Sequence, residues 1–180
     1  MGLKRVKDVV VLRYGHRHVR DYRVSSHCGL VARAFGAKKI VIVGEEDLEL
    51  KGSIDRVTEN WGGDFEVEFS GNWEKEFEKY RKLGYKIVHT TMYGLPLQDE
   101  VGKIRAAEKV LLVLGSQKVE KAVYEQADYN ISVTQQPHSE IAALAVFLHE
   151  YFEGGELGRG FKGAKKKIVP LERGKRVISQ

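Results

Sequence analysis

The most informative part of the chain, residues 110–148, reads VLLVLGSQKVEKAVYEQADYNISVTQQPHSEIAALAVFL. It begins with five apolar residues followed by Gly115, a pattern typical of a strand that is buried on both faces and ends in a turn. A second short strand, residues 129–133, ends in a polar segment before the apolar helix that starts near Ile141. We expect Ser139 to cap this helix, because its hydroxyl can accept from an N–H of the first turn, and Asn72 to cap the helix of residues 73–83 in the same way. Two strand ends thus lead through polar loops into helices, and ligands of open α/β sheets bind beside such ends.

The rest of the chain repeats this alternation. Apolar strands are predicted at residues 8–15, 39–44, 65–69 and 85–89, and apolar helical faces at 30–35, 54–61, 73–83 and 101–108 lie between them. The pattern predicts an α/β fold with a mostly parallel sheet and helices on both faces. Glu66 and Glu68 alternate with apolar residues in the third strand, which favours an edge position for it.

The C-terminal part of the chain has a different composition. Glycines at 154, 155, 158 and 160 precede two basic segments, 165–171 and 175–179, which flank Gly174. This arrangement predicts a small basic β-hairpin. We therefore expect a main domain at residues 1–153 and a basic extension at 154–180.

Length and composition limit the class of protein. The chain has 180 residues, a net charge of +5 and a pI of about 9.2, so a polyanionic partner is permitted without being required. A lone cysteine, Cys28, excludes an internal disulfide and fits a reducing cytosol. No segment has the pattern of a signal peptide or of a membrane span of about 20 apolar residues. A cytoplasmic protein with no membrane association is expected.

Three loops are candidates for a ligand crevice: Thr90–Gly94, Gly115–Val119 and Ile131–His138. The glycine loop lacks the later glycines of a dinucleotide-binding turn and the lysine of a phosphate-binding loop, and an ordinary turn remains an alternative for it. The amide side chains of Gln135 and Gln136 suit recognition of a purine edge or a ribose better than proton transfer, with a structural role as the alternative.

Charge is concentrated between His16 and His27, a segment that we interpret as a basic loop, where Arg17, Arg20 and Arg23 follow the end of the first strand. Arginines in such a place suit contact with phosphates, whereas a solvated surface is the simpler interpretation. The histidine spacing matches no common zinc site, so we expect no metal. Cys28 falls on an apolar helical face, and no Gly-x-Ser-x-Gly segment for serine hydrolase chemistry is present.

Several motifs together resemble one known family. They are Arg20-Asp21-x-Arg23, Ser26-His27, Ala32–Ala37, Thr91–Gly94, Leu114–Val119 and Gln136–Glu140. The sequence is similar over about residues 9–177 to the archaeal tRNA (cytidine-56-2′-O)-methyltransferases of the SPOUT class. The chain departs from the family at Ser25-Ser26, where threonines are expected, and at Thr90, where an apolar residue is expected.

The resemblance implies a fold, a cofactor and partners. It implies a C-terminal deep trefoil knot, against the rule that knots are rare, and a homodimer that binds S-adenosyl-L-methionine and tRNA. The implied catalytic residues are Arg20, Arg23 and His27. The implied cofactor-binding residues are Thr90, Thr91, Gly115, Ser116, Gln117, Lys118, Val119, Ile131, Ser132, Val133, Thr134, Gln135, Gln136, Pro137 and His138. The implied RNA-binding residues are Arg17, Lys165, Lys166, Lys167, Arg173, Lys175 and Arg176.

Three alternatives stay open at this point. The chain could be another SPOUT RNA methyltransferase that modifies a different nucleotide. It could also be a non-catalytic RNA-binding module with a vestigial cofactor pocket. A flavodoxin-like nucleotide protein is disfavoured, because no phosphate-binding Ser/Thr/Gly loop follows the first strand.

Overall fold

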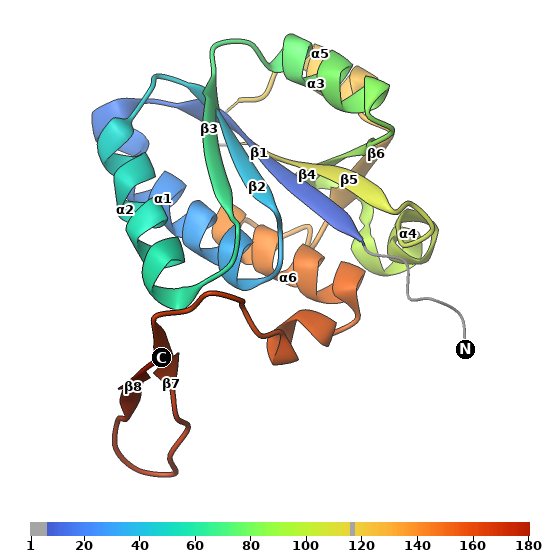
Figure 1. Ribbon diagram of the computed structural model, residues 1–180. Coiled ribbons are helices and arrows are strands. Elements are labelled where there is room, and N and C mark those ends of the chain that lie inside the picture. Colours follow the sequence, from blue (N-terminus) through green and yellow to red (C-terminus); the bar gives the residue numbers. More distant parts are fainter. Residues whose placement is uncertain (1–6, 116–117) are drawn as a thin grey trace.

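A computed structural model describes residues 7–115 and 118–180 (Figure 1). Helices and strands alternate along the main body. The elements in chain order are β1 (Asp8–His16), α1 (His18–Ala34), β2 (Lys39–Gly44), α2 (Leu48–Trp61), β3 (Glu66–Ser70), α3 (Trp73–Lys82), β4 (Lys86–Pro96), α4 (Leu97–Ile104), β5 (Lys109–Gly115), α5 (Lys121–Gln126), β6 (Tyr129–Ser132), α6 (Glu140–Phe152), the 3-10 helix η1 (Gly155–Gly158), β7 (Lys166–Ile168) and β8 (Val177–Ser179).

Six of these strands form one sheet in the order β3-β2-β1-β5-β4-β6. All five neighbouring pairs are parallel, which confirms the predicted parallel sheet and the edge position of β3. In the central strand, Val11 pairs with Ile40 of β2 and Leu112 of β5. Because parallel strands all end at the same edge, the loops that follow β1, β4, β5 and β6 lie along one edge of the sheet.

Helices cover both faces of the sheet, as predicted. One apolar core joins the sheet to α1, α2, α4 and α6, and a second joins its other face to α3 and α5 (Figure 1). Two helix starts follow the predicted chemistry: Asn72 accepts from the backbone N of Lys75 at 2.9 Å, and Ser139 accepts from that of Ile141 at 3.2 Å. These side chains satisfy N–H groups that the helix itself leaves unpaired.

The basic segment after β1 is a helix, and our interpretation of it as a loop was wrong. Helix α1 begins at His18, so the segment that carries Arg20, Arg23 and His27 is helical. Its buried face consists largely of polar and small residues: Asp21, Ser25, Cys28, Gly29, Ala32 and Arg33. A helix whose buried face is not apolar gives no hydrophobic periodicity, which is why the sequence pattern placed the helix only from about Leu30.

Strand β4 is interrupted beside β6. Thr90 and Leu95 both pair with Ile131, so residues 91–94 bulge out between the two halves of the strand. A Cβ atom on Gly94 would lie 2.5 Å from the backbone N of Ile131, a distance that only glycine permits. The bulge places Thr91, Met92 and Tyr93 at the edge where the loops after β5 and β6 also lie.

The C-terminal extension packs on the body and then leaves it. The backbone N of Gly63 donates to Lys162 O at 2.8 Å, and that of Lys165 donates to Asn60 O at 3.0 Å. Beyond this point β7 and β8 form the predicted antiparallel hairpin, which projects away from the sheet (Figure 1). The division into residues 1–153 and 154–180 as separate units stays a prediction.

Candidate functional site

A cavity of about 270 Å³ lies where β4, β5 and β6 end. Its wall comes from the bulge in β4, the end of β5, helix α5, the loop after β6 and the first turns of α6. The lining residues are His89, Thr90, Thr91, Met92, Tyr93, Gly115, Val119, Tyr124, Val133, His138, Glu140 and Ala143. Three loops that were expected to form a crevice therefore do meet around one hollow.

The predicted cofactor-binding residues divide into three groups. Those in the wall are Thr90, Thr91, Gly115, Val119, Val133 and His138. Those nearby but outside the wall are Lys118, Ile131, Ser132, Thr134, Gln135, Gln136 and Pro137. Ser116 and Gln117 lie outside the described residues. The geometry thus keeps all three predicted loops at the cavity, although only part of each loop faces it.

A histidine that the sequence patterns did not single out forms one side of the cavity. His89 Nδ1 lies 2.9 Å from Asn130 Oδ1, and Asn130 Nδ2 donates to Tyr124 O at 2.8 Å. The second bond fixes the Asn130 amide so that its oxygen faces the ring, which makes His89 Nδ1 the protonated nitrogen. Burial lowers the pKa of His89, although the Asn130 contact opposes the shift. The ring is therefore neutral, and its other nitrogen is an acceptor.

A buried ion pair closes another side of the wall. Arg13 Nη2 donates to Glu140 Oε1 at 3.0 Å, and the Arg13 side chain is only 1% exposed. Arg13 shares a strand face with Val9 and Val11, beneath α1 and α6. Burial raises the pKa of Glu140, whereas the positive charge of Arg13 counters that shift. The sequence feature that could have revealed this ion pair is Arg13, a charged residue within an otherwise apolar strand.

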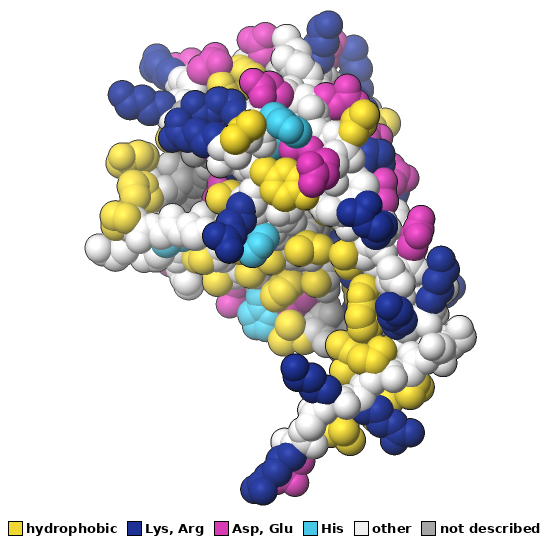
Figure 2. Space-filling view, turned by 90° about the vertical axis from the view of Figure 1, so that its left-hand side faces the viewer, with side chains coloured by type: hydrophobic (Ala, Val, Ile, Leu, Met, Phe, Trp, Pro, Cys, Tyr) yellow, Lys and Arg dark blue, Asp and Glu magenta, His cyan; other side chains and the backbone are white. Residues whose placement is uncertain are grey.

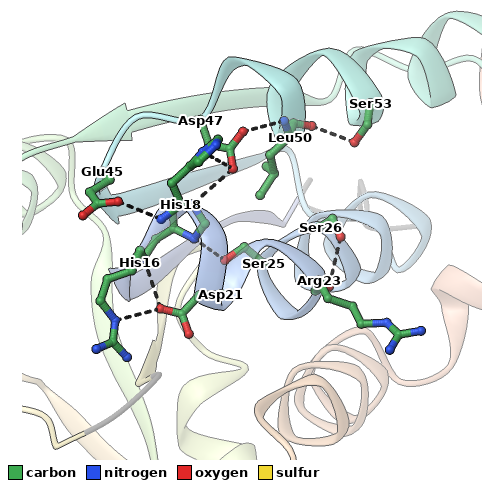
Figure 3. A network of polar contacts seen from close by, with 11 residues as sticks. His16, His18, Asp21, Arg23, Ser25, Ser26, Glu45, Asp47, Leu50 and Ser53 are labelled. Carbon is green, nitrogen blue, oxygen red and sulfur yellow. Dashed lines mark hydrogen bonds and ion pairs between the residues drawn. The ribbon is translucent and has the colours of Figure 1, made fainter.

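The corner between β1 and α1 holds a dense polar network (Figure 3). Asp47 Oδ2 lies 2.9 Å from His18 Nδ1 and 3.5 Å from His16 Nε2, and Asp47 Oδ1 accepts from the backbone N of Leu50. His16 Nδ1 lies 2.8 Å from Ser25 Oγ. Asp47 and Ser25 have no exposed surface. These contacts connect β1, α1 and the start of α2, although His16 Nε2 and Asp47 Oδ2 have no hydrogen-bond partner among the described residues.

Asp21, the acid of the basic segment, also has a local partner. Asp21 accepts from the backbone N of Arg17 at 3.0 Å and from Arg17 Nε at 3.3 Å (Figure 3). Burial would raise the pKa of Asp21, but these bonds and the charge of Arg13 lower it overall. Asp21 thus stays ionised and stabilises the first turn of α1.

The predicted catalytic residues Arg20, Arg23 and His27 are exposed on α1. Their spacing of three and four places them along one side of the helix. None of them lines the cavity, and neither does Arg17. In Figure 3 the side chain of Arg23 points away from the polar network. Within one chain the structure therefore separates the predicted catalytic residues from the wall of the predicted cofactor site.

A second cavity, of about 670 Å³, lies at the opposite edge of the sheet. It is enclosed between the amino ends of the strands and the C-terminal extension, and its wall includes Arg33, Phe65, Arg159 and Phe161. Arg33 is held there by its bond to Gly62 O and by the Phe161 ring, 4.8 Å away. These contacts attach the extension to the body, and the smaller cavity at the carboxyl edge remains the candidate site.

Within residues 7–115 and 118–180, no group of three His, Cys, Asp or Glu side chains could hold a metal ion. His16, His18 and His27 do not gather in space, because the first two face Asp47 and the third is exposed. In the same part of the chain, no helix is long and apolar enough to cross a membrane.

Comparison with known proteins identifies the family. A family described as tRNA ribose 2′-O-methyltransferase, aTrm56, matches residues 61–178. The chain is 48% identical over 176 residues to the tRNA (cytidine(56)-2′-O)-methyltransferase of Thermococcus kodakarensis, covering 96% of this chain and 97% of the relative. The chain belongs to this tRNA methyltransferase family. The family resemblance seen in the motifs is confirmed.

A second archaeal family member, from Pyrococcus horikoshii, is 49% identical over 174 residues, covering 94% of this chain and 84% of the relative. Among solved structures, the chain is similar to the SpoU methyltransferase AviRb from Streptomyces viridochromogenes in complex with AdoMet, with a TM-score of 0.58 and 18% identity. That likeness covers 88% of this chain and 61% of the other. At this level of identity, the likeness supports only the fold of the chain.

Proposed function

We propose that this protein transfers a methyl group from S-adenosyl-L-methionine to the ribose 2′-hydroxyl of cytidine 56 in tRNA. The observation that supports it most is the cavity where β4, β5 and β6 end, in a chain nearly half identical, over almost its full length, to a relative with that name. A non-catalytic module with a vestigial pocket would not need a hollow with polar groups left open in its wall.

The wall suits this cofactor. When bound, S-adenosyl-L-methionine supplies a methyl group on a positively charged sulfur. Gly115 lets the backbone approach a ligand closely, and the hydroxyls of Thr90 and Thr91 lie beside it. His89 adds a neutral acceptor, and Glu140 adds a carboxylate whose Oε2 atom is buried with no hydrogen-bond partner among the described residues. We assign adenine and ribose binding to the loops 115–119 and 131–138.

The position of α1 supports an active site that is shared between two subunits. Arg20, Arg23 and His27 are exposed outside the cavity, so a second copy is needed to bring such residues to a nucleotide at its mouth. Arg23 or Arg20 would stabilise the forming alkoxide or orient the adjacent phosphate. An arginine stays protonated, so the base is His27, water or a phosphate oxygen.

We propose that the homodimer forms through α6. Ala142 and Val146 on its outer side are exposed, and Val146 is 38% exposed. An isologous dimer would bury this apolar surface against its own copy. We also propose that the chain forms a trefoil knot, built from the loop after β5, the Thr134–His138 loop and helix α6.

The C-terminal extension is the proposed tRNA-binding surface. Figure 2 shows lysine and arginine side chains along the projecting hairpin. The proposed contacts are Lys165, Lys166, Lys167, Arg173, Lys175 and Arg176, which are all exposed, together with Arg17. Binding should weaken with salt in proportion to the phosphates neutralised. We place this tRNA-modifying activity in the cytoplasm.

The decisive experiment is incubation of unmodified tRNA transcript with methyl-labelled S-adenosyl-L-methionine, followed by mass-spectrometric mapping. One methyl on the ribose of cytidine 56 is expected, and a transcript with uridine at that position is the matched control. Methylation of another nucleotide would indicate a different SPOUT specificity. No transfer, together with no heat of cofactor binding in calorimetry, would favour the vestigial module.

The role of α1 has its own test. Replacing Arg23 by alanine should reduce methyl transfer by about 100-fold or more, because a charge at the developing alkoxide is lost. Affinity for S-adenosyl-L-methionine should stay unchanged, since Arg23 does not line the cavity. Arg56→Ala, a change at another arginine on the outer side of a helix, is the control. An unchanged transfer rate in the Arg23 variant would remove that residue from the mechanism.

A further inference from the structure

Glu140 is the single carboxylate in the cavity wall formed by the described residues. Its side chain is 15% exposed, and it stands at the first position of α6, just after the cap residue Ser139. The other titratable groups in that wall are histidines and tyrosines: His89, Tyr93, Tyr124 and His138. Any positively charged atom that enters the cavity therefore finds one fixed negative charge there.

The partner of that carboxylate lies behind the wall. Arg13 donates to Glu140 Oε1 at 3.0 Å but does not line the cavity. The pair is thus a dipole whose negative end faces the hollow. Glu140 Oε2 and the Arg13 atoms Nε and Nη1 are buried without hydrogen-bond partners in the described part of the chain. A buried pair that is incompletely satisfied adds little stability, which leaves its presence here to be explained.

We propose that Glu140 makes the cavity prefer the charged sulfonium donor over the uncharged thioether that remains after transfer. This inference rests on the proposed function. In the reaction the ribose oxygen bonds to the methyl carbon, the carbon–sulfur bond breaks, and sulfur keeps the electron pair and loses its positive charge. The hydroxyl proton passes to the base. Donor and product share their ammonium and carboxylate groups, so the ratio of their affinities reports on the sulfur charge.

The preference follows from electrostatics in a partly enclosed site. A charge pair separated from bulk water interacts more strongly than an exposed pair and is screened less by salt. Loss of the sulfur charge removes this attraction, so the product leaves a site that holds the donor. A purely structural role for the Arg13–Glu140 pair predicts something different, because damage to the wall would weaken both ligands alike.

Titration calorimetry with S-adenosyl-L-methionine and S-adenosyl-L-homocysteine tests the inference. Glu140→Gln keeps an acceptor for Arg13 but removes the charge, so the donor-to-product affinity ratio should fall by about tenfold, or about 1.4 kcal/mol. Glu120→Gln removes the same charge from a residue outside the wall that bonds to Tyr14 at 2.6 Å, and it should leave the ratio unchanged. An unchanged ratio in the Glu140 variant, or an equal fall in the Glu120 variant, overturns the inference.

A double variant guards against failure to fold. Glu140→Gln leaves Arg13 buried without a counter-charge, which destabilises the chain. Arg13→Gln combined with Glu140→Gln removes both charges and allows an amide pair, and it should show the same loss of ratio. If wild-type protein binds neither ligand, the proposed function fails. If wild-type protein binds both and the folded double variant keeps the wild-type ratio, only the inference about Glu140 fails.

Discussion

Two corners of the same sheet edge use similar residue types in opposite ways. After β1 and β2, the side chains of His16, His18, Ser25 and Asp47 contact one another at 2.8–3.5 Å, and none of them lines the cavity (Figure 3). After β4, β5 and β6, polar side chains surround a cavity of about 270 Å³. The polar groups of the first corner contact one another, whereas those of the second corner surround space that a ligand can enter.

The two corners differ in whether their polar side chains face a cavity. At the cavity, Asn130 fixes His89 by one ring nitrogen and leaves the other as an acceptor. At the network corner, both ring nitrogens of His16 lie near partners, Ser25 at 2.8 Å and Asp47 at 3.5 Å. A histidine or an acid at a strand end is therefore evidence of a binding site only when it faces a cavity, as His89 and Glu140 do.

The largest expected effect comes from breaking the first corner. Asp47→Ala removes the cap of α2 and the carboxylate that faces two histidines, so the free energy of unfolding should fall by about 3–5 kcal/mol. Asp55→Ala, which removes a half-exposed acid paired with Lys51 on the same helix, should change it by less than about 1 kcal/mol. Chemical denaturation measures both. Cofactor affinity should stay near wild type in each, and a large loss for Asp47→Ala would mean that the two corners are one site.

The next effect is expected at the cavity corner. A methyl group on Gly94 would meet the backbone of residues 130–131 at 2.5–2.6 Å, so Gly94→Ala should destabilise the chain by about 1–3 kcal/mol. It should also weaken binding of S-adenosyl-L-methionine, because the displaced bulge carries Thr91 and Tyr93 of the wall. Gly102→Ala is the control: no atom of the described residues lies within 4 Å of the added Cβ, and the change should stabilise α4 by up to about 1 kcal/mol. Wild-type affinity in the Gly94 variant would show that the bulge does not shape the cavity.

The comparison also shows what sequence patterns could reveal. The alternation of apolar strands and helices was enough to predict the parallel sheet and its edge strand β3. The side chains of Asn72 and Ser139 were enough to predict the helix caps. Each of these features depends on local composition. Helix α1 was missed at its start, since residues of its buried face pair with polar groups outside the helix: Ser25 with His16, and Arg33 with the carbonyl of Gly62. Apolar periodicity carries no information about a helix that is buried through hydrogen bonds.

The candidate site was predictable by loop but not by residue. The three loops follow from strand ends, and six of the predicted cofactor-binding residues line the cavity. The bulge in β4 depends on Thr90 and Leu95 both pairing with Ile131, a long-range contact that no local pattern encodes. In the sequence, Glu140 resembles any acid in the first turn of a helix. Only its contact with the buried Arg13 distinguishes it from such residues.

The free energy of unfolding should also change with pH, by about 1 kcal/mol. Burial and the nearby Arg13 charge lower the pKa of His16 despite Asp47, and burial also lowers that of His89. Below about pH 6.5 the unfolded chain binds protons at these histidines that the folded chain does not, so stability falls as pH falls, by up to about 1.4 kcal/mol per unit and per histidine. His16→Asn should flatten the decrease in thermal stability between pH 7.5 and 5.5, whereas His27→Asn on the outer side of α1 should not. Equal slopes in the two variants would contradict a neutral, buried His16.

The smallest expected effect isolates one hydroxyl of the cavity wall. Tyr124 Oη lies 3.2 Å from Thr91 Oγ1, while its ring packs edge-on against His89 with 4.7 Å between centroids. Tyr124→Phe keeps the ring contact, so stability should change by no more than about 1 kcal/mol. Because the bond helps to hold the bulge against α5, affinity for S-adenosyl-L-methionine should fall only severalfold in calorimetry, much less than for Gly94→Ala. If affinity fell as much as in Gly94→Ala, the Tyr124 hydroxyl would contact the ligand directly. Tyr124 would then contribute more to the specificity of the cavity than the backbone of the bulge does.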